Sequence, residues 1–163
     1  MLPPALTEPA AAIADRLKAR GETIAVVESS AGGLISAALL AVPGASAYYR
    51  GGIVIYTLDG AKEQLAGVAP WPAGVRSASE PFARWLASSG AAKLAADWGF
   101  GETGAAGPSG NPYGDPAGHA WVAVCRPDGE TQTQHVLTGS DDRPANMESF
   151  AAAGLALLLD ALS

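Results

Sequence analysis

Short apolar runs alternate along this 163-residue chain with stretches in which apolar residues recur every three or four positions. Runs rich in Val and Ile are typical of buried strands, whereas the three-to-four spacing is typical of amphipathic helices. The predicted strands are 23–27, 53–56, 99–103, 119–125 and 131–137. The predicted helices are a first one from the cap Thr7 to the stop at Gly21, then 34–40, 61–65, 79–96 and 145–162.

The order of these elements predicts an α/β layered fold in one domain covering residues 1–163. Strands and helices alternate as far as the third strand, which is typical of helices packed on a largely parallel sheet. Pro127, Asp128 and Gly129 predict a tight turn between the last two strands, so this pair should form an antiparallel hairpin. The sheet is therefore predicted to be mixed.

Three irregular segments follow predicted strands. They are the turn 28–33 (Glu-Ser-Ser-Ala-Gly-Gly), the residues after Tyr56, and the Gly- and Pro-rich loop 103–118. In open α/β sheets, ligands sit beyond the C-terminal ends of the parallel strands. The sequence therefore predicts one site assembled from these three segments.

The turn 28–33 joins a predicted strand to a predicted helix and carries two adjacent serines. Backbone N–H groups at a helix N-terminus favour an anion or a developing oxyanion. Ser29 is therefore a candidate nucleophile, although capping is the commoner role of a serine that precedes a helix. Glu28 is a candidate carboxylate base or a residue that orients the turn.

Tyr56 and Lys62 suggest how such a serine is activated without a histidine. A serine needs a base to become a nucleophile, and a buried lysine can serve directly or through a tyrosine hydroxyl. Arg143, ahead of the last helix, can pair with a carboxylate or a phosphate. Alternatively, Arg143 is a surface residue that balances Asp141 and Asp142.

Other site chemistry finds less support in the sequence. His119 and His135 lie on the predicted hairpin, and ordinary strand histidines are favoured over a Ser-His-Asp triad because no nucleophile elbow is present. The one cysteine, Cys125, excludes an internal disulfide and is typical of core packing. No clustered spacing predicts a metal site, and loop 104–110 lacks the Gly-Lys-Ser/Thr end of a Walker loop.

Charge and composition narrow the range of partners. The formal net charge is −6 and no basic stripe is present, so nucleic-acid binding is not expected. Hydrophobic residues make up 48% of the chain, which is typical of a globular domain. No signal-peptide pattern opens the sequence, and no apolar run approaches the roughly 18 residues that span a bilayer. We therefore expect a cytoplasmic protein without membrane contact.

Five stretches carry motifs in a fixed order: 25–34 (AVVESSAGGL), 42–49 (VPGASAYY), 51–57 (GGIVIYT), 103–108 (TGAAGP, with Gly118 beyond it) and 139–143 (GSDDR). Together they resemble the CinA C-terminal domain family, which includes the nicotinamide mononucleotide deamidases of the PncC type. The resemblance covers nearly the whole chain.

The resemblance implies a three-layer α/β/α sandwich with a mixed, mostly parallel sheet, in a homodimer. Its deamidase members hydrolyse the carboxamide of a pyridine nucleotide to the acid and ammonia, without a metal or other cofactor. It implies Ser29 as nucleophile, Tyr56 and Lys62 as the activating pair, and Arg143 as a ligand of the substrate phosphate. The further positions expected to bind substrate are Glu28, Ser30, Gly32, Gly33, Thr103, Gly104 and Gly107.

The chain departs from the family pattern at four places. These are Ser30-Ala31 where Cys-Thr is usual, Lys62 one position further from Tyr56, a changed loop after Pro108, and Asn146-Met147 where a second arginine is usual. Two alternatives therefore stand beside the deamidase prediction. One is a catalytically silent domain that binds a nucleotide or a partner protein, and the other is an amidase for another small amide.

Overall fold

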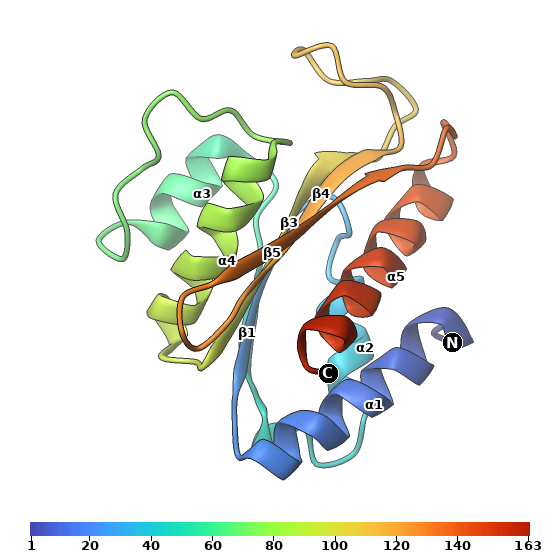
Figure 1. The fold of residues 1–163 in the computed structure, drawn as a ribbon. Helices are drawn as coiled ribbons and strands as arrows, with labels where there is room; N and C mark the ends of the chain where they lie inside the picture. The colour runs from blue at the N-terminus through green and yellow to red at the C-terminus, as the bar shows by residue number, and fades with distance from the viewer.

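Five strands form one mixed sheet in the order β2-β1-β3-β4-β5 in the computed structural model, which describes all residues from Met1 to Ser163 (Figure 1). The strands are β1 (Ile24–Glu28), β2 (Tyr49–Val54), β3 (Trp98–Ala105), β4 (His119–Cys125) and β5 (Thr131–Leu137). β1 pairs in parallel with β2 and β3, whereas β4 is antiparallel to both β3 and β5. The predicted mixed sheet and its terminal hairpin are therefore confirmed.

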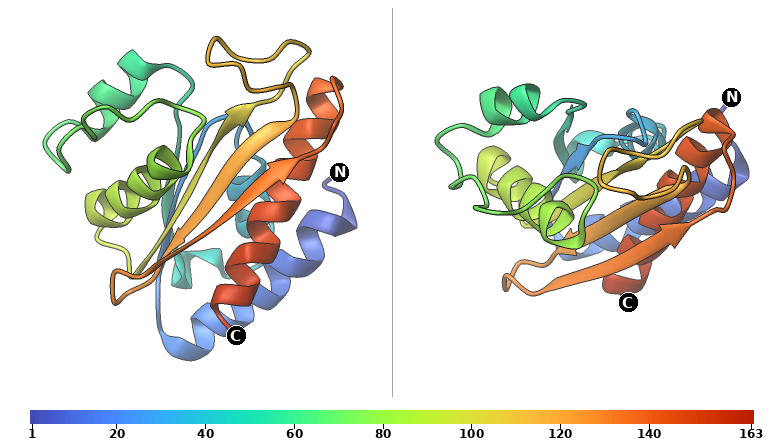
Figure 2. Two further views of the ribbon diagram at one scale, coloured as in Figure 1. Left: turned by 45° about the horizontal axis from the view of Figure 1, so that its top comes forward. Right: turned by 90° about the horizontal axis from the view of Figure 1, so that it is seen from above.

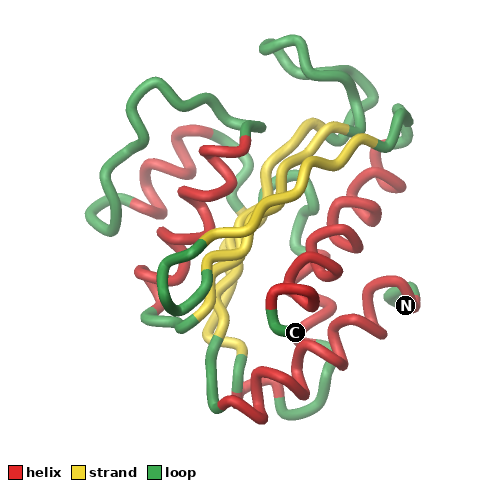
Figure 3. Tube along the Cα trace, in the orientation of Figure 1, coloured by secondary structure: helices red, strands yellow, loops and turns green.

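Helices cover both faces of this sheet, which confirms the three-layer α/β/α arrangement (Figure 3). One face packs against α1 (Pro4–Arg20), α2 (Leu34–Leu40) and α5 (Arg143–Ala161), and the other against α3 (Leu58–Leu65) and α4 (Glu80–Leu94). A short 3-10 helix, Ala45–Ala47, lies between α2 and β2. The two long loops, 66–79 and 106–118, lie at the same end of the sheet (Figure 2).

The larger hydrophobic core lies between the sheet and the helices α1, α2 and α5. Its largest fully buried side chains include Tyr48, Phe100 and Phe150. A smaller cluster around Val27 and Phe82 lies beneath α4 on the other face. Burial of this apolar surface is the main favourable term in the free energy of folding.

Helix α4 lies unusually close to β3 because two positions of that strand lack a side chain. A Cβ atom at Gly99 would lie 2.0 Å from the Ala87 carbonyl oxygen, and one at Gly101 would lie 2.2 Å from that of Ala83. This close approach places the start of α4 beside the C-terminal end of β3.

The first helix begins earlier than the sequence predicts. It starts at Pro4, so Thr7 is not its cap, and Pro9 lies inside it rather than in its first turn. Pro9 cannot donate a backbone hydrogen bond. The earlier start is nevertheless favoured because it buries Leu6 completely in the main core.

β2 and α3 also differ from the predicted elements. β2 is an edge strand with alternating exposure rather than a buried strand, and Tyr56 lies beyond its end. A register shift between Ile24 and Ala25 accommodates Arg50 as a bulge. Helix α3 begins at Leu58 because the Thr57 side chain accepts a hydrogen bond from the Gly60 N–H at 3.0 Å.

None of the helices combines the length and the apolar composition that crossing a membrane requires.

Replacing Gly101 with alanine should push α4 away from β3. The added methyl group would overlap the backbone of α4, and such overpacking typically lowers the free energy of unfolding by about 1–3 kcal/mol. Urea denaturation measures this change. Ser88→Ala, at an exposed position of the same helix, serves as the control and should stay within about 0.5 kcal/mol of the parent. Equal stability of the two variants would contradict the packing described here.

Candidate functional site

A pocket of about 290 Å³ opens where β1, β2 and β3 end. Its walls come from the segments that follow these strands and from the two long loops. Its apolar lining includes Ile55, Ala61, Phe82 and Leu86, and its polar lining includes Ser29, Tyr56, Thr57, Ser77, Thr103, Asn111 and Tyr113. Four predicted site positions therefore meet here, namely Ser29, Tyr56, Thr103 and Gly104.

The two adjacent serines face different surroundings. Ser29 is half-buried and lines the pocket. Ser30 is only 3% exposed, and its hydroxyl donates to a carboxylate oxygen of Glu102 instead of facing the pocket. The structure therefore separates a pocket serine from a structural one, and it does not place Ser30 among the pocket residues.

Glu102 is a buried acid that no motif of the sequence indicates. Its Oε2 accepts hydrogen bonds from the backbone N–H groups of Ser29 and Ala31, both at 2.9 Å. Burial raises the pKa of Glu102 from 4.5 to about 7, although the donors Ser30, Ala31 and Ser29 oppose that rise. The only signal in the sequence was a carboxylate inside a predicted strand.

Glu28, the other acid of the turn, also lies away from the pocket. It is completely buried, and its carboxylate accepts from the backbone N–H groups of Ile35 at 3.2 Å and Ser36 at 2.9 Å. The Ser36 hydroxyl donates to it at 2.6 Å. A carboxylate of the chain itself therefore occupies the N-terminus of α2, which corrects the expectation that this N-terminus receives a substrate anion.

The backbone N–H groups of the turn are directed inward. Ala31 donates to Glu102, and Gly32 donates to the Ser29 carbonyl oxygen at 3.1 Å. Gly32 and Gly33 take positive φ values of 67° and 98°, which allow this tight turn. Neither glycine lines the pocket. The first two amides of the segment 31–33 are thus not free to stabilise an oxyanion.

Arg143 connects two of the predicted segments through Tyr56, but the structure places neither Arg143 nor Gly107 among the pocket-lining residues. Its Nη2 donates to Tyr56 Oη at 2.6 Å, and its Nη1 donates to the Gly107 carbonyl oxygen at 2.6 Å. Asp142 accepts the Ala145 N–H as the cap of α5, and Arg143 forms no ion pair with it or with Asp141. The interpretation of Arg143 as a balance for these two aspartates is therefore not supported.

Lys62 lies outside the pocket. It borders a separate hollow of about 210 Å³, and its Nζ lies 5.7 Å from the ring centroid of Trp71. On α3 the residues that line the pocket are Leu58 and Ala61, and Ala61 borders the second hollow as well. Successive residues of a helix are rotated by about 100°, so Lys62 faces away from that side. The structure does not bring Lys62 together with Ser29.

Asn146 and Met147, which stand where a second arginine is usual in the family, make structural contacts within the chain. Asn146 is buried, and its Nδ2 donates to the carbonyl oxygens of Ala106 and Ser140, each at 2.8 Å. Met147 reaches the turn, where its terminal carbon would lie 2.6 Å from a Cβ atom at Gly32. Neither residue can supply a positive charge to the site.

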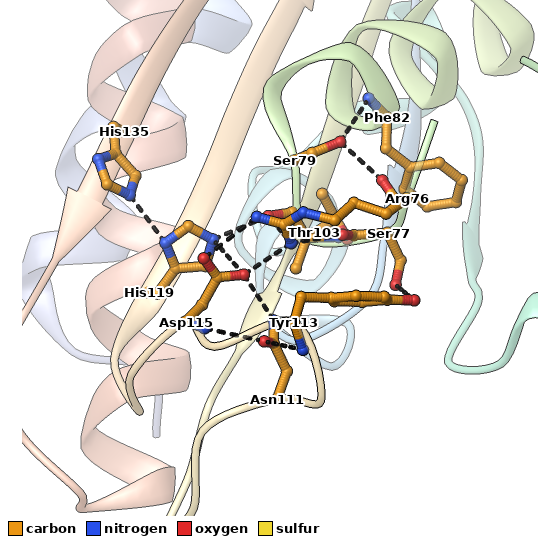
Figure 4. A network of polar contacts seen from close by, with 11 residues as sticks. Arg76, Ser77, Ser79, Phe82, Thr103, Asn111, Tyr113, Asp115, His119 and His135 are labelled. Carbon is orange, nitrogen blue, oxygen red and sulfur yellow. Dashed lines mark hydrogen bonds and ion pairs between the residues drawn. The ribbon is translucent and has the colours of Figure 1, made fainter. Parts of the chain in front are cut away.

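The two long loops are joined by a polar network (Figure 4), and two of its members, Asn111 and Tyr113, line one wall of the pocket. Arg76 donates to both carboxylate oxygens of Asp115, at 2.7 and 3.2 Å, and these hydrogen bonds are the main cause of the lowered pKa of Asp115. The Arg76 guanidinium lies 4.9 Å from the centroid of the Tyr113 ring. Asn111 binds the same carboxylate at 2.7 Å. This two-loop wall is defined by Arg76, Asn111, Tyr113 and Asp115.

His119 supports this wall from the sheet. Its Nε2 lies 2.8 Å from the Ala78 carbonyl oxygen, and its Nδ1 lies 2.8 Å from His135 Nε2. A carbonyl oxygen only accepts, so Nε2 of His119 is the donor in the contact with Ala78. Burial and the neighbouring His119 lower the pKa of His135. Both ring nitrogens of His119 are thus engaged away from Ser29, as expected for a strand histidine and not for a triad.

Comparison with known proteins places this architecture in a family. The family model described as the CinA C-terminal domain matches residues 6–162. The chain belongs to the CinA C-terminal domain family. It is 40% identical over 146 residues to a CinA-like protein of Anaeromyxobacter sp. (strain Fw109-5), and 41% identical over 132 residues to one of Gloeobacter violaceus. These alignments cover 89% and 80% of this chain.

The CinA domain spans about a third of the length of these curated relatives, with 35% and 30% of them covered. Solved structures match over nearly their full length. The competence/damage inducible protein CihA of Agrobacterium tumefaciens superposes with a TM-score of 0.89 at 28% identity, covering 99% of this chain and 98% of that one. A CinA superfamily protein of Enterobacter cloacae gives 0.87 at 33% identity, covering 97% and 92%.

The buried Glu102 should make the stability of this CinA domain depend on pH. A carboxyl group whose folded-state pKa is raised contributes stability below its unfolded pKa of 4.5 and loses it as the pH rises through about 7. Relative to Glu102→Gln, the parent should therefore lose on the order of a few kcal/mol as the pH rises from about 4.5 to about 8. Urea denaturation across this range measures the difference. Glu63→Gln, at an exposed carboxylate of α3, is the control; a constant difference for Glu102→Gln would contradict the assignment.

The two-loop wall should loosen when its carboxylate is removed. In Asp115→Asn, the charge that binds Arg76 is lost, so native-state cleavage of loops 66–79 and 106–118 by thermolysin should accelerate by about five- to tenfold. Arg50→Ala provides a control, because Arg50 makes one 3.3 Å contact with Ala95 and lies outside the pocket. Unchanged cleavage in Asp115→Asn would show that the ion pair does not hold the loops.

Proposed function

We propose that this CinA domain is a metal-independent amidohydrolase that hydrolyses the carboxamide of a pyridine nucleotide, with Ser29 as the nucleophile. The observation that carries this proposal is the position of Ser29, which is the one serine of the turn that opens into the pocket. The pocket volume of about 290 Å³ lies near the lower end of the range for small-molecule sites, roughly 300–1,000 Å³. That volume suits one planar ring with its carboxamide.

The proposed reaction has two steps. Ser29 Oγ attacks the carboxamide carbon, the C–N bond breaks, and ammonia leaves with the serine proton while an acyl ester forms on Ser29. Water then hydrolyses the ester, which releases the carboxylic acid and restores the serine. Both steps need a group that accepts and returns a proton beside Ser29.

Tyr56 is the pocket residue to which we assign this proton transfer. Arg143 donates to the Tyr56 oxygen at 2.6 Å, and a guanidinium at this distance stabilises negative charge as it develops on the oxygen. Arg143 has no carboxylate partner, so it also provides a cation for a substrate phosphate at the rim. The proposal assigns no step to Lys62, because that residue borders a different hollow.

Thr103 is assigned to the carbonyl oxygen of the substrate. Its Oγ1 accepts the Ala78 N–H at 3.0 Å, and its own hydroxyl proton has no acceptor within the chain. Because Thr103 lines the pocket, that proton is available to a bound carbonyl oxygen. A donor positioned before the reaction stabilises the oxyanion without further reorganisation.

A second candidate function is a silent domain that binds a nucleotide without hydrolysing it. The observation that favours it is the Ser29 hydroxyl, which makes no hydrogen bond to a base within the chain. A third candidate, an amidase for an amide without phosphate, is favoured by the buried Asn146, which replaces the second arginine. The homodimer implied by the family resemblance stays a prediction.

Ammonia release from nicotinamide mononucleotide, nicotinamide riboside and simple pyridine carboxamides tests these functions. We expect turnover of the nucleotide, a loss of at least about 10³-fold in Ser29→Ala, and retention within about threefold in Lys62→Met. Thermal stabilisation by the nucleotide without turnover would instead support the silent domain. Turnover of the unphosphorylated amides alone would support the third function, and undiminished release by Ser29→Ala would contradict the mechanism.

A further inference from the structure

β1 stops pairing with β3 just before the turn that carries Ser29. The last parallel pair is Val27 with Gly101, after which Glu28 pairs only with Val54 of β2. The backbone N–H groups beyond this point therefore meet no carbonyl oxygen of β3. Buried amides without an acceptor are costly, so the turn needs an acceptor from elsewhere.

The Glu102 side chain supplies that acceptor for three consecutive residues. Its Oε2 binds the N–H groups of Ser29 and Ala31, both at 2.9 Å, and its Oε1 binds the hydroxyl of Ser30. Glu102 is completely buried and has no cation partner. Its side chain thus connects the interior of β3 to the backbone on both sides of Ser30.

The position of the Ser29 hydroxyl depends on this connection. Ser29 Oγ makes no hydrogen bond within the chain, so no side-chain contact orients it. Its location follows from the backbone of the turn, and Glu102 fixes that backbone at Ser29 itself and at Ala31. A group that fixes the backbone of a nucleophile controls the reactive geometry without touching the substrate.

We propose that Glu102 is a positioning residue, which holds the 29–31 backbone so that Ser29 Oγ points into the pocket. This inference rests on the proposed role of Ser29 as the nucleophile. Loss of the carboxylate should displace the hydroxyl relative to the bound carboxamide, and a displacement of about 1 Å can cost about 10²-fold in rate. Substrate binding should change little, because Glu102 does not line the pocket.

Steady-state kinetics of three Glu102 variants test the proposal. Glu102→Ala should lower kcat by about 10²-fold and leave KM within about threefold. Glu102→Gln should retain kcat within about fivefold, because its carbonyl oxygen still accepts both N–H groups and its amide nitrogen donates to Ser30. Glu80→Ala is the matched control, since Glu80 also accepts from several donors but lies outside the pocket.

If Glu102→Ala does not fold, Glu102→Asp carries the same test. Its side chain is one methylene shorter and cannot keep both backbone contacts, so kcat should fall by about tenfold with KM unchanged. Parent-like kcat in Glu102→Ala or Glu102→Asp would overturn the proposal. A rise in KM with kcat unchanged would also overturn it.

Amide hydrogen exchange tests the positioning independently of turnover. The Ser29 and Ala31 amides should exchange about tenfold or more faster in Glu102→Ala than in the parent, and near the parent rate in Glu102→Gln. If the parent releases no ammonia, the proposed function is contradicted, but the exchange rates of the Ser29 and Ala31 amides still test whether Glu102 holds the turn. Unchanged exchange in Glu102→Ala would defeat the positioning role whatever the activity.

Discussion

The carboxylate of Glu102, set inside the sheet, holds the turn between β1 and α2. This turn must leave the sheet, reverse direction and enter a helix within a few residues, and its N–H groups cannot all find backbone acceptors. Glu102 binds two of them, and Glu28 binds two more at the start of α2. Two buried acids therefore take the place of a continued strand ladder.

In this arrangement, the residues that hold the turn in place differ from the residues that face the pocket. The buried acids and Ser30 face the interior, whereas Ser29, Tyr56 and Thr103 are among the polar residues that line the pocket. The opposite wall is built from two loops far apart in the sequence and joined through Arg76 and Asp115. The pocket thus depends on contacts formed only when the whole fold is complete.

The local pattern of the sequence was enough to predict four of the five strands, the terminal hairpin and the convergence of three segments on one pocket, whereas β2 lies earlier than predicted and is an edge strand. Ser29, Tyr56 and Thr103 follow or end neighbouring strands, so the topology alone brings them together. Helix boundaries were less predictable, because burial of Leu6 outweighs the missing N–H of Pro9.

The roles of Lys62, Glu102 and Arg143 were less predictable. They depend on the rotational position of a residue on its helix and on contacts between residues far apart in the sequence. The direction in which the Lys62 side chain points depends on where α3 begins, and the sequence does not determine that residue. The cap at Thr57 starts α3 at Leu58, which places Ala61 at the pocket and leaves Lys62 outside it. Glu102 could not be assigned a role, because its partners lie about seventy residues away in the chain and meet it only in the folded sheet. The contacts of Arg143 with Tyr56 and Gly107 likewise form only in the folded protein and could not be predicted from the sequence.

The most direct test of this account is to identify the residue that carries the acyl group during turnover. Rapid acid quenching of the enzyme with a pyridine carboxamide substrate, followed by peptide mass spectrometry, should show the acyl mass on Ser29 and none on Ser30. An adduct on another residue, or ammonia release without any adduct under conditions that trap serine esters, would contradict the account.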